Sequence, residues 1–297
     1  MPKANDVFAR LQIEANQLPP IRTDLYKRLE KELGGNKRVV SFFTSFRFPV
    51  IIDDSDADML EETLSGTDLN KDLVLLLNSP GGDALAAERI VNICRTFSKN
   101  GFSVIVPKMA KSAATMVCLG ADKIIMSKTS ELGPIDPQIV IYENGEPTRS
   151  QAAHEILESY NDLMNKASAA KGRIEPYLQQ LARFDARDIR RIKSAQDLSE
   201  KLAVSLLKSG TLKHLTIVEI KKKIKPLIDP KSTGDHGRPL FCYDVKKCGL
   251  NIEEVDNGSA MWRIVWELYV RINHVTLTST PKVIESLDKS YVSVLSQ

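Results

Sequence analysis

Short apolar runs alternate with amphipathic segments through the first half of the chain. The run at 73–77 is continuously apolar and the run at 102–106 almost so, as expected for strands buried on both faces of a mainly parallel sheet. Residues 84–97, between them, place apolar side chains at helical spacing. This alternation of strand and helix predicts right-handed crossovers and therefore an α/β fold.

The pattern changes after residue 150, where almost all the predicted elements are helices. We expect three regions: an N-terminal helical arm at 1–38, an α/β core at 39–150 and a helical extension at 151–297. The extension is expected to complete the domain and to mediate oligomerisation. The lysine run at 221–225 is predicted to be a solvated helix face, because no aromatic residues are interleaved with it.

Composition and charge give no reason to expect a nucleic-acid-binding, membrane or disulfide-rich protein. The chain has 297 residues, of which 42% are hydrophobic, and a formal net charge of +3. A charge so near balance gives no reason to expect nucleic acid or a membrane surface as a partner. No segment reaches the ~20 consecutive apolar residues of a membrane span. The cysteines are scattered and no secretory segment is recognised at the start, so we expect reduced thiols in a cytoplasmic protein.

A candidate nucleophile, Ser112, stands where a buried strand leads into a predicted helix. The first turn of a helix has unpaired N–H groups and the positive end of the helix dipole, so the N–H of Ala113 can bind a negative oxygen. The Gly81-Gly82 turn lets a second backbone N–H, that of Gly82, approach the same oxygen. Ser112 is therefore predicted to be a nucleophile served by an oxyanion hole, and not only an N-cap beside an ordinary turn.

Four ordered sequence blocks resemble those of the Clp-fold serine peptidases, the group that includes ClpP and the signal peptide peptidase A family. The likeness is greatest to the serine dehydrogenase proteinase (SDH) family. The blocks are Asn78-Ser-Pro-Gly-Gly-Asp83, Met109-Ala-Lys-Ser-Ala-Ala-Thr115, Leu119-Gly-Ala-Asp-Lys-Ile-Ile-Met126 and Leu132-Gly-Pro-Ile-Asp-Pro-Gln138. The resemblance implies a ClpP/crotonase-like ββα superhelix, a nucleophile at Ser112 and an oxyanion hole from Gly82 and Ala113. The chain departs from the pattern in having Ala113-Ala114 where a Gly-Gly pair is usual.

The general base is left open by the sequence. A Ser–His–Asp peptidase of this fold would have its histidine within the segment 135–138, which contains none. The signal peptide peptidase A relatives use a Ser–Lys dyad, and Lys166 is our first candidate because its separation from Ser112 resembles theirs. Lys171 and His154 are the alternatives. The competing interpretation of each of the three is a solvent-facing helix residue, and for His154 this is the favoured one. Lys111 is a poor base, since consecutive side chains diverge.

The resemblance and the motifs together predict a serine endopeptidase that cleaves peptides or unfolded protein segments. No GxxxxGK[ST] loop is present, so the activity is expected to be independent of ATP. No residues have metal-ligand spacing on a shared element, and neither a metal nor a cofactor is expected. A homo-oligomer is expected. The alternatives are a crotonase-like acyl-CoA enzyme that uses the same oxyanion hole, or a catalytically inactive Clp-fold scaffold.

Overall fold

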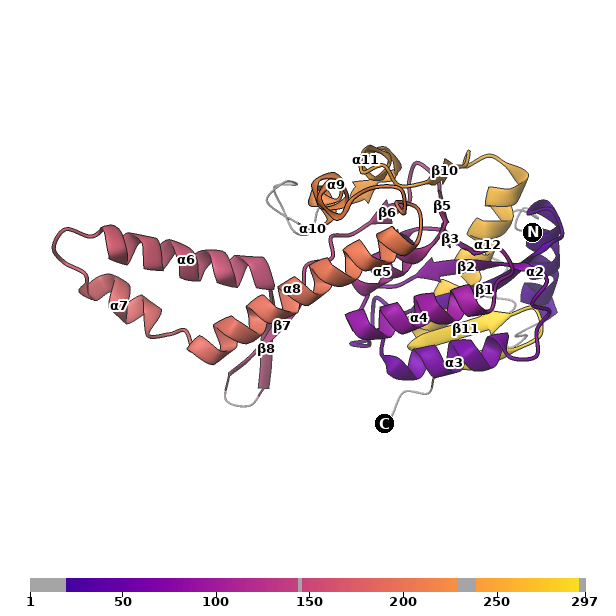
Figure 1. Ribbon diagram of the computed structural model, residues 1–297. Coiled ribbons are helices and arrows are strands. Elements are labelled where there is room, and N and C mark those ends of the chain that lie inside the picture. The colour runs from indigo at the N-terminus through magenta and orange to yellow at the C-terminus, as the bar shows by residue number, and fades with distance from the viewer. Residues whose placement is uncertain (1–19, 144–145, 229–238, 294–297) are drawn as a thin grey trace.

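A computed structural model describes residues 20–143, 146–228 and 239–293. Its centre is a seven-stranded sheet with the strand order β10-β5-β3-β2-β1-β11-β12 (Figure 1). Neighbouring strands from β10 to β1 run parallel, whereas β11 and β12 are antiparallel additions at one edge. The strands are β1 (Lys37–Thr44), β2 (Asp72–Asn78), β3 (Phe102–Val106), β5 (Lys123–Met126), β10 (Ile252–Glu254), β11 (Lys282–Ser286) and β12 (Ser290–Val292). The fold is therefore α/β with a mainly parallel sheet, as predicted.

Helices cover both faces of the sheet, and this explains the continuous apolar run of β2. Leu73, Leu75 and Leu77 pack into one core beneath α3 (Asp54–Leu64), α4 (Ala84–Thr96) and α5 (Ala113–Gly120). Val74 and Leu76 point to the other face and pack into a second core with α2 (Pro20–Glu32) and α12 (Ala260–Thr278). All five side chains are fully buried, so alternation along the strand divides them between two apolar layers.

The segment predicted as a helical extension also supplies strands to the central sheet. β10 pairs with β5 at one edge of the sheet, and β11 pairs with β1 toward the other. The predicted N-terminal arm lies partly outside the described residues, and its described helix α2 packs against α12. A buried ion pair from Arg22 Nε to Glu285 Oε1, 2.7 Å long, joins α2 to β11. Segments near the two ends of the described chain are thus in contact.

A helical arm, residues 153–198, projects away from the sheet (Figure 1). A hairpin of β7 (Gln138–Glu143) and β8 (Glu146–Ala152) leads into α6 (Ala153–Ala169), which is followed by α7 (Glu175–Leu181) and α8 (Ala186–Ser209). The only buried residues of α6 are Ala153 and Ala167, and α7 buries none. The second half of α8 returns to the body and packs on α5. The arm therefore has almost no core of its own.

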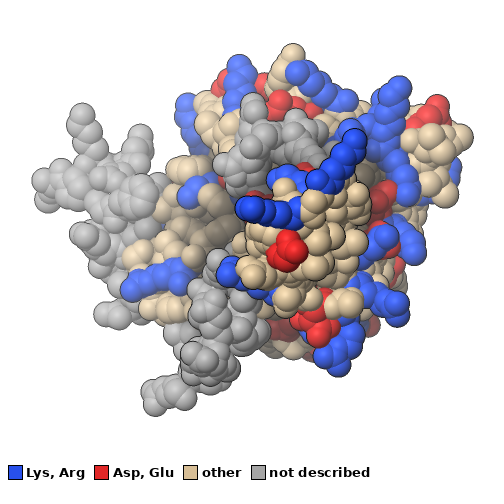
Figure 2. All heavy atoms as spheres, turned by 90° about the vertical axis from the view of Figure 1, so that its left-hand side faces the viewer, with Lys and Arg blue, Asp and Glu red and all other residues tan. Residues whose placement is uncertain are grey.

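The remaining elements lie near the base of the arm. They are the small sheet of β4 (Met109–Ala110), β6 (Glu131–Leu132) and β9 (Leu240–Phe241), with the helices α9 (Ile217–Lys223), α10 (Lys225–Ile228) and α11 (Cys242–Lys247). Lys221, Lys222 and Lys223 are exposed, which confirms the predicted solvated helix face. Basic and acidic side chains are interspersed on the side of the molecule toward which the arm points (Figure 2). Within the described segments, no helix combines the length and apolar character needed to cross a membrane.

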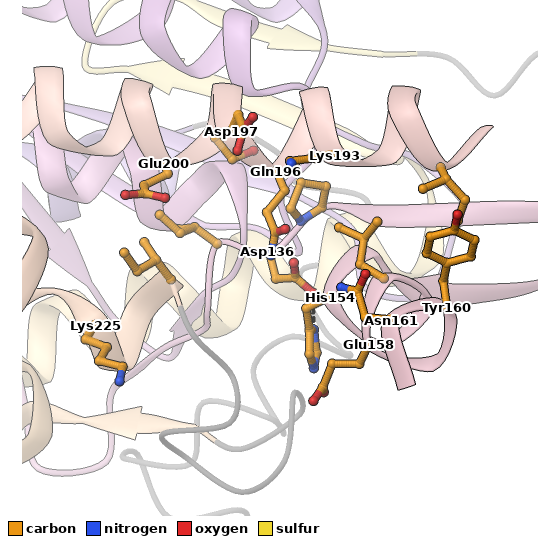
Figure 3. A pocket seen from close by; sticks show the side chains of 16 residues that line it. Asp136, His154, Glu158, Tyr160, Asn161, Lys193, Gln196, Asp197, Glu200 and Lys225 are labelled. Carbon is orange, nitrogen blue, oxygen red and sulfur yellow. Dashed lines mark hydrogen bonds and ion pairs between the residues drawn. The ribbon is translucent and has the colours of Figure 1, made fainter. Parts of the chain in front are cut away.

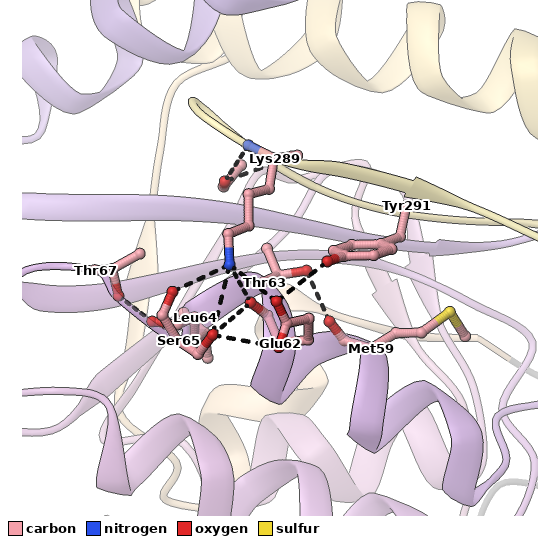
Figure 4. A network of polar contacts seen from close by, with 9 residues as sticks. Met59, Glu62, Thr63, Leu64, Ser65, Thr67, Lys289 and Tyr291 are labelled. Atoms are coloured by element: carbon pink, nitrogen blue, oxygen red, sulfur yellow. Dashed lines mark hydrogen bonds and ion pairs between the residues drawn. The ribbon is translucent and has the colours of Figure 1, made fainter.

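The β11–β12 hairpin holds both ends of α3 through two lysines. At the start of the helix, Lys282 Nζ lies 2.7 Å from Asp53 Oδ2 and 2.8 Å from Asp56 Oδ2. At its end, Lys289 Nζ donates to the carbonyl oxygen of Glu62 at 2.6 Å and to that of Ser65 at 3.1 Å (Figure 4). A cation at a helix C-terminus also interacts favourably with the helix dipole. The hairpin therefore anchors α3 as well as extending the sheet.

The Lys282 contact should dominate the stability of this edge. Burial raises the pKa of Asp56, whose side chain is fully buried, while Lys282 opposes that rise. Lys282→Met leaves the carboxylate without a counter-ion, so we expect a loss of about 3–5 kcal/mol in the free energy of unfolding. The loss should shrink as the pH falls, because a raised pKa makes the folded state bind the proton more tightly than the unfolded chain does. Urea unfolding at several pH values measures both effects.

Lys123→Met is the matched control, since Lys123 pairs at 2.8 Å with Glu253 on a surface where both side chains are more than a third exposed. Its loss should be at most about 1 kcal/mol. Equal unfolding midpoints for the two variants would contradict the assignment of a buried, stabilising role to Lys282.

Candidate active site

Ser112 lies between β4 and α5 in an unusual backbone conformation. With φ +50° and ψ −119°, it is the one non-glycine residue in the described part of the chain that has a positive φ. Such a conformation costs on the order of 1–3 kcal/mol and persists only where the surroundings impose it. Here its N–H donates to the carbonyl oxygen of Pro134 at 3.2 Å, and its own carbonyl accepts from Met116 at 3.1 Å. The strain, at a half-buried serine, points to a functional position.

The Gly81-Gly82 turn lies directly against Ser112. A β-carbon at position 81 would be 2.4 Å from the carbonyl oxygen of Lys111, 2.8 Å from the Ser112 Cβ and 3.0 Å from the Ala113 nitrogen. Gly81 also has φ +102°, in the region that favours glycine. Any side chain at this position would therefore separate the turn from Ser112.

Gly82 forms an isolated parallel bridge with Ile52, and this bridge orients its amide. The Ile52 N–H donates to the Gly81 carbonyl and the Asp83 N–H donates to the Ile52 carbonyl, each at 2.8 Å. In a parallel bridge, the residue between the two bonded neighbours turns its own N–H and C=O away from the partner strand. The N–H of Gly82 therefore points away from Ile52. Among the described residues, neither this N–H nor that of Ala113 has an acceptor. The turn thus presents two backbone donors beside Ser112.

Polar residues of the two motifs hold these segments together. Asn78 Oδ1 accepts from the Met109 N–H at 3.2 Å, and Ser79 exchanges backbone hydrogen bonds with Met109 and Lys111 at 3.2 and 3.0 Å. Ser79 Oγ also accepts from the Gly81 N–H at 3.1 Å. The Asn-Ser pair before the glycines therefore fixes the turn against β4, the strand that leads to Ser112.

The lysines predicted as bases do not lie beside Ser112. Lys166 is exposed on α6, about 20 Å along the helix axis from its first residue, Ala153. Lys171 is exposed beyond the end of that helix. Neither side chain is in the desolvated setting that a neutral amine needs. Lys111 pairs with Glu131 at 2.5 Å, in agreement with its exclusion as a base.

The structure instead pairs His154 with Asp136, a residue that the sequence analysis did not select. His154 Nδ1 lies 2.6 Å from Asp136 Oδ2, and the two side chains are 14% and 0% exposed. They lie in the wall of a cavity of about 670 Å³ between α6, α8 and α10 (Figure 3). Ser112 does not line this cavity. The available signal was the Leu132–Gln138 block, which holds Asp136 and in which the sequence analysis looked only for a histidine.

Other chemistries have less support among the described residues. No group of three or more His, Cys, Asp or Glu side chains is arranged to hold a metal ion there. All four cysteines are buried and free. Burial raises the pKa of the Cys94 thiol to about 12 and that of Cys248 to about 11, which disfavours a reactive thiolate. Ser112 is the side chain that the local geometry singles out.

The close approach at Gly81 can be tested by stability. Gly81→Ala should lower the free energy of unfolding by at least about 2 kcal/mol more than Gly66→Ala, because overpacking a tight contact typically costs 1–3 kcal/mol. Both glycines have positive φ, but a β-carbon at Gly66 would meet nothing within 4 Å, so the difference isolates the contact. Urea unfolding of both variants measures it. Similar losses would show that Gly81 is required only for its backbone angles.

Comparison with known proteins agrees with this geometry. Residues 38–151 match the family model of the ClpP-like SDH-type serine proteinases. Two uncharacterized proteins of Methanocaldococcus jannaschii are similar: MJ1495 is 30% identical over 182 residues, which span 58% of this chain and 57% of the relative. MJ0137 is 31% identical over 139 residues, 44% of this chain and 48% of the relative. The chain thus matches about half the length of each relative. The segment that carries Gly82, Ser112 and Asp136 is thus similar to the ClpP-like SDH-type serine proteinases.

Proposed function

We propose that this protein is a serine peptidase in which Ser112 is the nucleophile and the N–H groups of Gly82 and Ala113 form the oxyanion hole. The observation that carries the proposal is the strained Ser112 held against a glycine turn that presents backbone donors. The match of residues 38–151 to a serine proteinase family supports the same assignment.

The arrangement suits acyl transfer. Ser112 Oγ attacks the peptide carbonyl carbon, and the carbonyl oxygen becomes an oxyanion that the two N–H groups stabilise. Each such donor typically lowers the barrier by about 3–4 kcal/mol. A crotonase-like acyl-CoA enzyme would use the same donors but would have no need of a nucleophile at position 112. The strain stored at Ser112 therefore favours the peptidase.

Peptides and unfolded protein segments are the substrates that we propose. The chain has no GxxxxGK[ST] nucleotide loop, so cleavage itself is expected to need no ATP. A folded protein substrate would have to be unfolded elsewhere before it could reach Ser112.

A fluorophosphonate probe tests the nucleophile. The wild-type protein should be labelled and should hydrolyse a fluorogenic casein, whereas Ser112→Ala should lose both activities without unfolding, because only the attacking oxygen is removed. Ser168→Ala, which removes an exposed hydroxyl from α6, is the control and should behave as wild type. Equal labelling of wild type and Ser112→Ala would exclude this function.

We further propose that the protein self-associates through the helical arm. Met164, Ile174 and Leu178 are 41%, 37% and 51% exposed there, on helices that have almost no core of their own. Light scattering should give several times the chain mass of 33.1 kDa. Leu178→Glu should lower that mass, because it places a charge in the contact, while Val218→Glu on α9 should not. A monomer over a wide range of concentration would refute the proposal.

A further inference from the structure

We infer that Lys111 and Glu131 are positioning residues for Ser112, and that their ion pair holds the strained backbone of the serine in place. The inference rests on the proposed function, since the position of Ser112 matters for a reaction only if the serine is the nucleophile. Neither side chain is assigned a contact with the substrate. Both act through the backbone that carries the hydroxyl.

The ion pair between these two side chains is partly sheltered from water. Lys111 Nζ lies 2.5 Å from Glu131 Oε1, and the side chains are 23% and 19% exposed. In the surface pair of Lys123 with Glu253, the corresponding values are 37% and 46%. Breaking a sheltered pair leaves one charge without a partner in a setting where water compensates for it poorly. The pair therefore restrains the lysine side chain more firmly than a surface contact would.

Gly133 sets the path that the lysine side chain follows. A β-carbon at position 133 would overlap Lys111 Cδ and would lie 3.2 Å from both the Cα and the Cβ of the lysine. The aliphatic part of Lys111 therefore lies directly across the backbone of residue 133. Gly133 does not have a positive φ, so no backbone angle requires a glycine there. Its lack of a side chain makes room for the lysine.

Lys111 links the two segments that contact Ser112, the glycine turn and the segment that starts with β6. Its N–H donates to the carbonyl oxygen of Ser79 at 3.0 Å, just before the turn. Its side chain crosses Gly133 and ends at Glu131. The backbone of the lysine is thus held by one segment and its side chain by the other.

The backbone ladder between β4 and β6 ends at Ser112. The two strands have two residues each, and the N–H of Gly133 donates to the carbonyl oxygen of Ala110 at 2.9 Å. The proline that follows this glycine has no N–H, and that of Ile135 donates to Leu227 at 2.8 Å, outside the small sheet. The last bond is the one that the Ser112 N–H donates to the proline carbonyl, at 3.2 Å. The side chain of the preceding lysine adds a link at this end of the ladder.

The strained φ of Ser112 makes this link relevant to catalysis. A residue in such a conformation keeps it only where its surroundings impose it. Without the ion pair, we expect the backbone at 111–112 to relax and to turn Ser112 Oγ away from the donors of Gly82 and Ala113. A displacement of about 1 Å can slow a reaction about 10²-fold. Because neither side chain contacts the substrate, the loss should fall on kcat and leave KM unchanged.

Lys111→Met keeps an aliphatic stem across Gly133 but removes the charge. It should lower kcat for a fluorogenic peptide by about tenfold to a hundredfold, with KM within about twofold of wild type, and should slow fluorophosphonate labelling of Ser112 in parallel. Glu131→Gln should give the same result. The double variant should be no worse than either single one, because the pair is already broken in both. Steady-state kinetics and labelling rates measure these effects.

Lys111→Arg is the conservative variant, since arginine has the same carbons up to Cδ and keeps a cation for Glu131. It should restore kcat to within about threefold of wild type, and losses equal to those of Lys111→Met would contradict the role of the ion pair. Lys108→Met is the matched control, because it removes an exposed lysine from the same segment. Its kcat should stay within about twofold of wild type, as expected for a surface substitution.

Gly133→Ala tests the path of the side chain. It should lower kcat about as much as Lys111→Met does, because the added β-carbon displaces the lysine. In a Lys111→Ala background, the same substitution should cost no more than about a further twofold, because Cδ is no longer there. Equal costs in the two backgrounds would show that Gly133 acts independently of the lysine, against this inference.

Thermal unfolding of every variant separates positioning from folding. A folded Lys111→Met with the kcat of wild type would overturn the inference and leave the serine peptidase intact, whatever its unfolding temperature. A raised KM with unchanged kcat would also overturn it, because that result assigns the lysine to substrate binding. Glu131→Gln, which keeps the size and shape of the side chain, takes its place if Lys111→Met does not fold. Absence of Ser112-dependent labelling in the wild type would instead overturn the peptidase itself, and this inference with it.

Discussion

The backbone of Gly81 lies against the backbone of Lys111 and Ser112 with no room for a side chain between them, and the active-site geometry depends on this contact. It joins the turn after β2 to the strand end that carries Ser112. Because β4 and the β2 turn are also linked through Asn78 and Ser79, the two segments form one rigid unit. The positive φ of Ser112 is tolerated because hydrogen bonds on both sides of the residue impose it.

The central sheet gives this unit its support. Two buried apolar layers fix β2 from both faces, so the position of the glycine turn is set by the core and not by the turn itself. The β11–β12 hairpin adds to this support. Its residues Lys282 and Lys289 hold the two ends of α3, the helix that covers one face of β2. Segments that lie far apart along the chain therefore contribute to the position of one turn.

The site divides between two parts of the molecule. Ser112, Gly82 and Ala113 belong to the sheet core, whereas His154 belongs to the first turn of the arm. Within the described residues, the segment 134–137 connects the two parts through backbone hydrogen bonds to Ser112 and Ala153.

The amino-acid sequence by itself determined the elements whose signal is local. The unbroken apolar run of β2, the helical spacing of α4 and the Pro-Gly-Gly turn each depend on neighbouring residues, and all were predicted. Ser112, Gly82 and Ala113 could be selected because their chemistry follows from a strand end, a turn and a helix start. The family resemblance added the order of these blocks.

Tertiary structure alone decided the rest, because it depends on contacts between distant segments. Strand β11 joins β1 across most of the chain, and no local pattern specifies that partner. The exposure of Lys166 depends on the direction in which α6 leaves the body, which periodicity does not encode. The pairing of Asp136 with His154 requires the β7–β8 hairpin to bring α6 back to the segment 134–137. A local pattern determines which elements form, whereas burial and long-range hydrogen bonds decide which side chains meet.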